Sequence, residues 1–122
     1  MQRQCFGVEK IPGFSSVVIV NNEIFLSSIN GISPENFHDA VSQTKLICDK
    51  LKNLLEKSGC NVDDIKKVGI YVSAQKDVEA VMSEVASFLG DIKPCISCIC
   101  VDLEDENMLV KLDCQAYKRC TE

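Results

Sequence analysis

The chain has 122 residues, 46% of them hydrophobic and 25% charged, which suits one globular domain spanning residues 1–122. A net charge of −5 argues against nucleic acid as a partner, because nucleic-acid binding usually needs a basic surface. No apolar run approaches the roughly 20 residues of a membrane helix, and no secretory signal is evident at the start. We therefore expect a cytoplasmic protein with no membrane partner.

The first predicted elements are short strands. Residues 5–8 are an apolar stretch before a turn and predict an edge strand. Residues 16–20 and 23–27 flank Asn21-Asn22, and asparagine tolerates the left-handed backbone conformation that a two-residue hairpin turn requires. The pattern therefore predicts a β-hairpin.

A long helix is predicted next. Ser33-Pro34 provides a capping serine and a proline suited to the first helical position, so we expect the helix to begin there. Apolar residues then recur at three- and four-residue spacing as far as Leu55, and Gly59 is the expected end.

A strand and a second helix follow. Residues 67–73 alternate between two faces, as residues of a strand do. A second helix is expected over 78–89, capped by Asp77 and closed by Gly90.

Two more strands complete the chain. Residues 94–101 are the most apolar run, and residues 108–116 alternate between apolar and mostly polar side chains. We expect these two strands to pair as a hairpin across the acidic turn 102–107. The predicted order is β-β-β-α-β-α-β-β, an α+β fold whose mixed sheet carries both helices on one face, because crossover connections are right-handed. The uncovered face should then meet another subunit.

Cysteine chemistry is the sharpest local alternative, since the chain holds eight cysteines and three of them form Cys95-x-x-Cys98-x-Cys100. In a strand, Cys95 would point away from the other two, and no second ligand pair exists, so we predict no metal site. Cys98 and Cys100 share a face and remain candidates for redox sensitivity. The other cysteines are best explained as reduced, buried residues.

The remaining polar candidates differ in weight. His38, the single histidine, lacks a recognisable nucleophile motif, so we assign no catalytic role to it. Lys111 and Asp113 lie on the polar side of their strand, on the uncovered face of the sheet. Polar groups there should line a cleft or pair across an interface, and the sequence leaves both alternatives open.

Six segments in a fixed order also carry a family resemblance. They are residues 14–16, 24–28, 43–56, 59–68, 94–98 and 110–116. In this order they resemble the Rid family, also called YjgF-type or endoribonuclease L-PSP proteins, from about Phe14 to Tyr117. The resemblance implies a chorismate-mutase-like fold, a homotrimer with ligand clefts between subunits, and hydrolysis of reactive imines or enamines without a metal or cofactor.

The resemblance also implies a ligand-binding set that departs from the usual one. The arginine that holds the substrate carboxylate corresponds to Ile96, which offers no donor. The tyrosine of the amino-terminal motif corresponds to Phe14, which keeps the ring and loses the hydroxyl. A helix asparagine near the cleft corresponds to Met82, and the glutamate that positions water corresponds to Lys111.

Two positions of the same set are retained. Ser27 matches the serine of the family's Ser-Gly motif, and Cys98 matches the cysteine after the arginine position. Three hypotheses follow: a trimeric binder of carbonyl, imine or carboxylate metabolites without the standard deaminase activity; an active imine deaminase or related hydrolase that uses Lys111 as a relocated anion contact; and a ribonuclease. The acidity of the chain and the lack of a cleft histidine favour the ribonuclease least.

Overall fold

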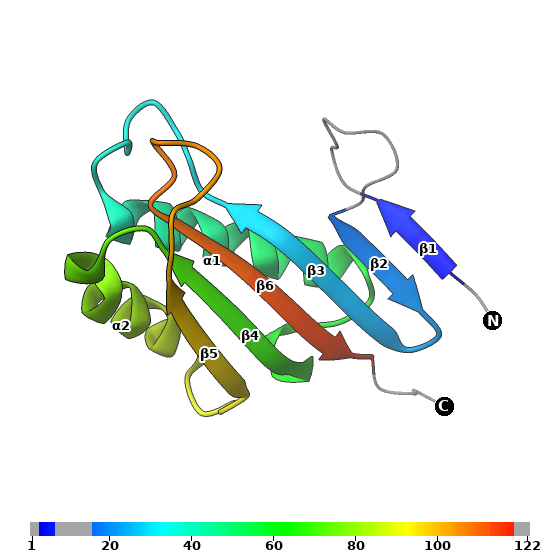
Figure 1. The fold of residues 1–122 in the computed structure, drawn as a ribbon. Helices are drawn as coiled ribbons and strands as arrows, with labels where there is room; N and C mark the ends of the chain where they lie inside the picture. Colours follow the sequence, from blue (N-terminus) through cyan, green and yellow to red (C-terminus); the bar gives the residue numbers. More distant parts are fainter. Residues whose placement is uncertain (1–2, 7–15, 119–122) are drawn as a thin grey trace.

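The computed structural model describes residues 3–6 and 16–118, and Figure 1 shows their arrangement. The main elements, in chain order, are β1 (Arg3–Phe6), β2 (Val17–Val20), β3 (Glu23–Asn30), α1 (Ala40–Lys57), β4 (Ile65–Val72), α2 (Val78–Leu89), β5 (Cys95–Cys100) and β6 (Val110–Tyr117). Single 3₁₀ turns, Val62–Asp64 and Gln75–Asp77, precede β4 and α2. The predicted order of elements and the α+β class are confirmed.

The six strands form one sheet in the order β1-β2-β3-β6-β4-β5. β6 lies antiparallel between β3 and β4, whereas β5 runs parallel to β4 at the edge. The predicted hairpin of β5 with β6 is therefore wrong. The crossover through α2 makes β5 a parallel neighbour of β4, and residues 101–109 are long enough to carry the chain past the end of β4 to its other side.

Both helices pack on one face of the sheet, as predicted (Figure 1). Alternate residues of β6 point into the core between the sheet and the helices. Val110, Leu112, Cys114 and Ala116 are buried, and the residues between them are half-buried or exposed. No helix within 3–6 and 16–118 is long and apolar enough to cross a membrane.

The other face of the sheet, which we call the open face, is covered by no helix of the described residues. Three of the large hydrophobic side chains that remain exposed point to this face: Phe25, Ile99 and Tyr117. Exposed aromatic and aliphatic side chains gathered on one face are typical of an interaction surface.

The first helix begins six residues later than predicted, at Ala40. Asp39 is the capping residue, and its carboxylate accepts a hydrogen bond of 3.0 Å from the Ser42 amide. Residues 33–39 instead form turns stabilised by Asn36, which accepts from the Ser33 amide at 2.8 Å and donates to the Gly31 carbonyl at 2.8 Å. This side-chain bonding competes with a helix that would start at Ser33.

Several predicted turns are confirmed in detail. Asn21 has a φ of 56°, in the hairpin between β2 and β3. Gly59 follows Ser58, the C-cap residue of α1, and Gly90 is the C-cap residue of α2; their φ values are 84° and 60°, as expected for helix ends. Asp77 is the N-cap residue of α2, as predicted, but its side chain makes no capping hydrogen bond. The predicted first strand is displaced to Arg3–Phe6, at the sheet edge, and residues 7 and 8 lie outside the described part.

Candidate functional site

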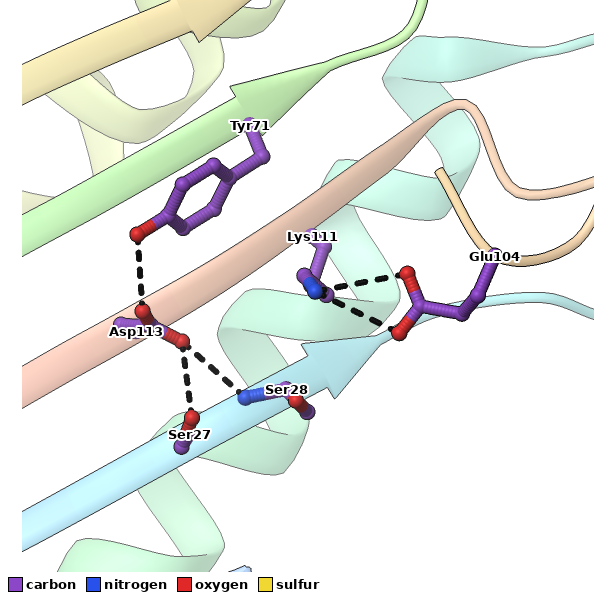
Figure 2. A network of polar contacts seen from close by, with 6 residues as sticks. All are labelled: Ser27, Ser28, Tyr71, Glu104, Lys111 and Asp113. Atoms are coloured by element: carbon purple, nitrogen blue, oxygen red, sulfur yellow. Dashed lines mark hydrogen bonds and ion pairs between the residues drawn. The ribbon is translucent and has the colours of Figure 1, made fainter. Parts of the chain in front are cut away.

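The centre of the open face is organised around the Asp113 carboxylate on β6. It accepts hydrogen bonds from the Ser27 hydroxyl at 3.1 Å, the Ser28 amide at 3.1 Å and the Tyr71 hydroxyl at 2.9 Å (Figure 2). The two neighbours of β6 thus hold its carboxylate, with Ser27 and Ser28 on β3 and Tyr71 on β4. A carboxylate with three fixed donors is positioned as part of the fold and is not a freely rotating surface group.

A bulge in β3 places the two serines at this carboxylate. The register between β3 and β6 shifts between Leu26 and Ile29, both of which are buried. The intervening pair is therefore displaced toward the open face, and Ser28 adopts a φ of 57°. Bulges often redirect side chains next to functional sites, and this one directs a hydroxyl and an amide at the same oxygen.

Lys111 lies two residues before Asp113 on β6 and points to the same face of the sheet. Its ammonium nitrogen is 3.3 Å from each carboxylate oxygen of Glu104 and 5.4 Å from the centre of the Tyr71 ring (Figure 2). The Lys111 side chain is 20% exposed, whereas that of Glu104 is 57% exposed. The cation is thus supported by an aromatic face and paired with a solvent-exposed acid.

Tyr71 connects the two parts of this network. Its hydrogen bond to Asp113, together with the negative charge of that carboxylate and a smaller effect of burial, raises the pKa of the Tyr71 hydroxyl. Tyr71 therefore stays protonated and acts as a donor to Asp113 at neutral pH.

A hollow of about 280 Å³ lies beside the network, over β4. Lys67, Gly69, Tyr71, Ser97 and Asp113 line it together with neighbouring residues. Gly69 opens its floor, since a Cβ atom there would lie 3.5 Å from the Tyr71 hydroxyl oxygen and 3.7 Å from the Asp113 Cβ. The hollow has room for a few ligand atoms next to the hydroxyls of Tyr71 and Ser97, the Asp113 carboxylate and the Lys67 ammonium.

The predicted ligand-binding residues do not lie together in one chain. Ser27 and Lys111 are on the open face with Asp113. Ile96 and Cys98 stand level with Val68 and Ile70, which point to the helix-covered side, and Cys98 packs against the core there. Met82, on α2, packs against that core too, and Phe14 lies outside the described residues.

The sheet itself separates these two groups. Ile96 remains 41% exposed because β5 is an edge strand, and Cys98 and Met82 are half-buried on the same helix-covered side. We call Met82, Ile96 and Cys98 the edge group, and we call Ser27, Lys111 and Asp113 the open-face group. Within one chain the two groups cannot line a common cleft.

Sequence reasoning missed two residues that contact the open-face group. It placed Asp113 on the uncovered face with Lys111, and the structure shows the Asp113 carboxylate accepting a hydrogen bond from Ser27. Tyr71, which donates to Asp113, and Glu104, which pairs with Lys111, were not predicted. The alternation of β4 and β6 contained the signal for Tyr71, because both strands place polar residues on the same uncovered face.

Cysteine geometry agrees with the predicted strand. Cys95 is level with the exposed Lys67, whereas Cys98 and Cys100 are level with the buried Ile70 and Val72, so the three thiols divide between two faces. Burial, and to a lesser extent the neighbouring Cys100, raises the pKa of the Cys98 thiol. In the part of the chain that the structure describes, no three potential ligands come together as a metal site.

Comparison with known proteins identifies the family. The endoribonuclease L-PSP family matches residues 8–118. A RutC family protein from Pyrococcus abyssi is 30% identical, over 97% of this chain and 99% of its own length. A YjgF-family protein from Neisseria meningitidis superposes with a TM-score of 0.87 at 24% identity, covering 99% of this chain and 98% of its own. One from Mycobacterium tuberculosis gives 0.85 at 22%, covering 95% and 99%.

Proposed function

The chain belongs to the Rid family, also described as the endoribonuclease L-PSP family, and we propose that it binds small carbonyl, imine or carboxylate metabolites in clefts between the subunits of a homotrimer. The separation of the edge group from the open-face group carries this proposal. Because the sheet lies between them, only a neighbouring subunit can bring one group opposite the other. A ring of three such contacts closes without leaving an unused surface.

The exposed apolar residues of the open face support the same arrangement. Phe25, Ile99 and Tyr117 are 37%, 51% and 46% exposed, and such side chains usually become buried on association.

Free cysteines suit the cytoplasm, which we propose as the location: Cys48, Cys60, Cys95, Cys98, Cys100 and Cys114 all carry free thiols.

We further propose that standard 2-imino acid deaminase activity is absent. Ile96 offers no hydrogen-bond donor at the position where the family arginine would hold the substrate carboxylate. A planar guanidinium forms two charge-assisted bonds to a carboxylate, and an aliphatic side chain forms none. The cleft should therefore bind carboxylate metabolites more weakly than a cleft that carries the arginine, or in a different orientation.

The alternative is an active hydrolase with a rearranged site, and the Asp113 network favours it. A carboxylate fixed by Ser27, Ser28 and Tyr71 can position a water molecule, and Lys111 can contact a substrate carboxylate in place of the arginine. Ammonia release from enzymatically generated 2-iminobutanoate separates the two functions. Turnover that disappears in Asp113→Asn and Lys111→Met would establish the hydrolase.

Subunit complementation tests the shared cleft. Ile96→Asp damages the edge group and Lys111→Met damages the open-face group, so each variant alone should lose binding of 2-oxobutanoate in calorimetry. Each mixed trimer contains one interface of three with both groups intact, which is about a quarter of all interfaces in the sample if mixing is random. Co-expression should therefore restore part of the binding capacity. A monomer in light scattering, or no recovery in verified mixed trimers, would overturn the proposal.

A further inference from the structure

The Lys111 ammonium is already partnered by a carboxylate from its own chain. Glu104 belongs to the connection between β5 and β6, and both of its oxygens lie 3.3 Å from the Lys111 nitrogen. Tyr71 supports the same ammonium from the sheet, with its ring centre 5.4 Å away. Sheet residues thus fix the lysine, and a connecting segment supplies its counterion (Figure 2).

The contact has the geometry of a replaceable one. Strong charge-assisted bonds between an ammonium and a carboxylate are about 2.7–2.9 Å long, whereas both Glu104 contacts are 3.3 Å. The Glu104 side chain is 57% exposed, so water can solvate it as soon as it leaves. Lys111 is 20% exposed and held by Tyr71, so it stays in position for another anion.

We infer that Glu104 is an internal competitor that occupies the position of a ligand carboxylate on Lys111. This inference rests on the proposed ligand-binding function and adds to it a residue that sets ligand affinity. When a ligand carboxylate binds Lys111, the Glu104 side chain moves into solvent. The binding free energy of every anionic ligand is then reduced by the free energy of the Lys111–Glu104 contact.

The spacing of the open-face group indicates the class of ligand. Lys111 and Asp113 are two residues apart on one strand, which separates their backbones by roughly 7 Å. An acid of a few carbon atoms can place its carboxylate on Lys111 and a carbonyl, imine or amine group toward Asp113 and Ser27. A 2-oxo acid or its imine has this arrangement, with one negative charge and one adjacent polar group.

Calorimetric titration of the assembled protein with 2-oxobutanoate tests the inference. Glu104→Gln removes the competing charge and should bind the probe roughly two- to fivefold more tightly than the wild type, the range expected for an exposed ion pair. Glu106→Gln is the matched control. It removes the same charge from an exposed position of the same segment and should change the affinity by less than the Glu104 substitution.

A second pair of variants keeps the inference separate from the proposed function. Lys111→Met should abolish binding, and Glu104→Gln combined with Lys111→Met should show no gain over Lys111→Met alone. If Lys111→Met abolishes binding but Glu104→Gln behaves like Glu106→Gln, the inference is wrong and the proposed function stands. If neither the wild type nor Glu104→Gln binds the probe, both fail. Binding by Glu104→Gln alone would support internal competition directly.

Discussion

The Tyr71 hydroxyl donates a 2.9 Å hydrogen bond to the Asp113 carboxylate and so joins β4 to β6 across the open face. The bond gives Tyr71 a measurable property, because the Asp113 carboxylate raises the pKa of the hydroxyl. The folded-state pKa lies above the unfolded value of about 10, so the stabilising effect is complete below that pH. It is lost as the pH rises through the folded-state pKa.

Asp113→Asn should therefore lower the pKa of Tyr71. The variant removes the negative charge that opposes tyrosinate formation, while an amide oxygen can still accept the hydrogen bond. The chain has only two tyrosines, so Tyr117→Phe as a common background leaves ultraviolet absorbance reporting on Tyr71 alone. An unchanged titration midpoint would contradict the assigned cause of the shift.

Ser28→Gly should stabilise the fold by about 1 kcal/mol. Ser28 has a φ of 57° in the β3 bulge, and a left-handed conformation costs a residue with a Cβ atom about 1–2 kcal/mol, partly offset by the flexibility of glycine in the unfolded chain. The amide bond to Asp113 is kept in the variant. Urea denaturation gives the change in free energy. Ser28→Ala is the control, and a gain as large as that of glycine would show that backbone strain is not the cause.

Gln43→Leu should destabilise the protein by roughly 2–4 kcal/mol. Gln43 is fully buried; its amide donates to the Asn36 and Asn107 carbonyls at 2.9 Å each, and its oxygen accepts from the Leu109 amide at 2.8 Å. Leucine fills a similar volume but leaves these three backbone groups unpaired.

Thr44→Val is the control for the Gln43 substitution. Thr44 is equally buried, but its hydroxyl bonds only the Ala40 carbonyl of the same helix. Losing that bond should cost about 1 kcal/mol in urea denaturation. Equal costs for the two variants would show that Gln43 does not connect α1 to the two loops.

The role of Gln43 shows where prediction from sequence stops. The apolar periodicity of α1 correctly predicted the buried residues from Ala40 to Leu55, since a repeated spacing determines which face of a helix is buried. A buried glutamine has no such periodic signal, because its partners lie on loops remote in sequence. The late start of α1 has the same origin, in side-chain hydrogen bonds made by Asn36.

In the candidate site too, the local pattern was predictable from the sequence and the long-range contacts were not. Alternation along β6 correctly placed Lys111 and Asp113 on the uncovered face. The partners of those residues depend on strand order, and the predicted β5–β6 hairpin would have put β5, not β4, beside them. Tyr71 could therefore not be identified as the donor to Asp113, because the position of β6 between β3 and β4 is a long-range property of the sheet.

Native-state thiol labelling should divide the cysteines by burial. Burial raises the pKa to about 12 for Cys48, about 11 for Cys60 and about 12 for Cys114, so these thiols should react only after unfolding. Exposed Cys95 and Cys100 should react in the native protein unless a neighbouring subunit covers β5. Peptide mass mapping assigns each label. Rapid native labelling of Cys114 would contradict the core packing of β6.

Ile96→Arg should restore a carboxylate contact to the cleft. Ile96 is 41% exposed, so a longer side chain fits without repacking the core, and the cost in stability should be small. A guanidinium contact to a carboxylate is worth about 1.5–3 kcal/mol, which corresponds to roughly 10- to 100-fold tighter binding of 2-oxobutanoate in calorimetry. Ammonia release from 2-iminobutanoate should rise as well, because Asp113 already supplies a fixed carboxylate.

Leu46→Arg is the matched control for that gain. Leu46 belongs to α1, outside both groups, and is 37% exposed, so it adds the same charge without altering the proposed cleft. Its effect on binding should be much smaller than that of Ile96→Arg if the ligand carboxylate on Lys111 of one subunit also faces the edge group of its neighbour. Equal gains from both substitutions would mean that net charge alone controls binding, and the assignment of Ile96 to the cleft would then be wrong.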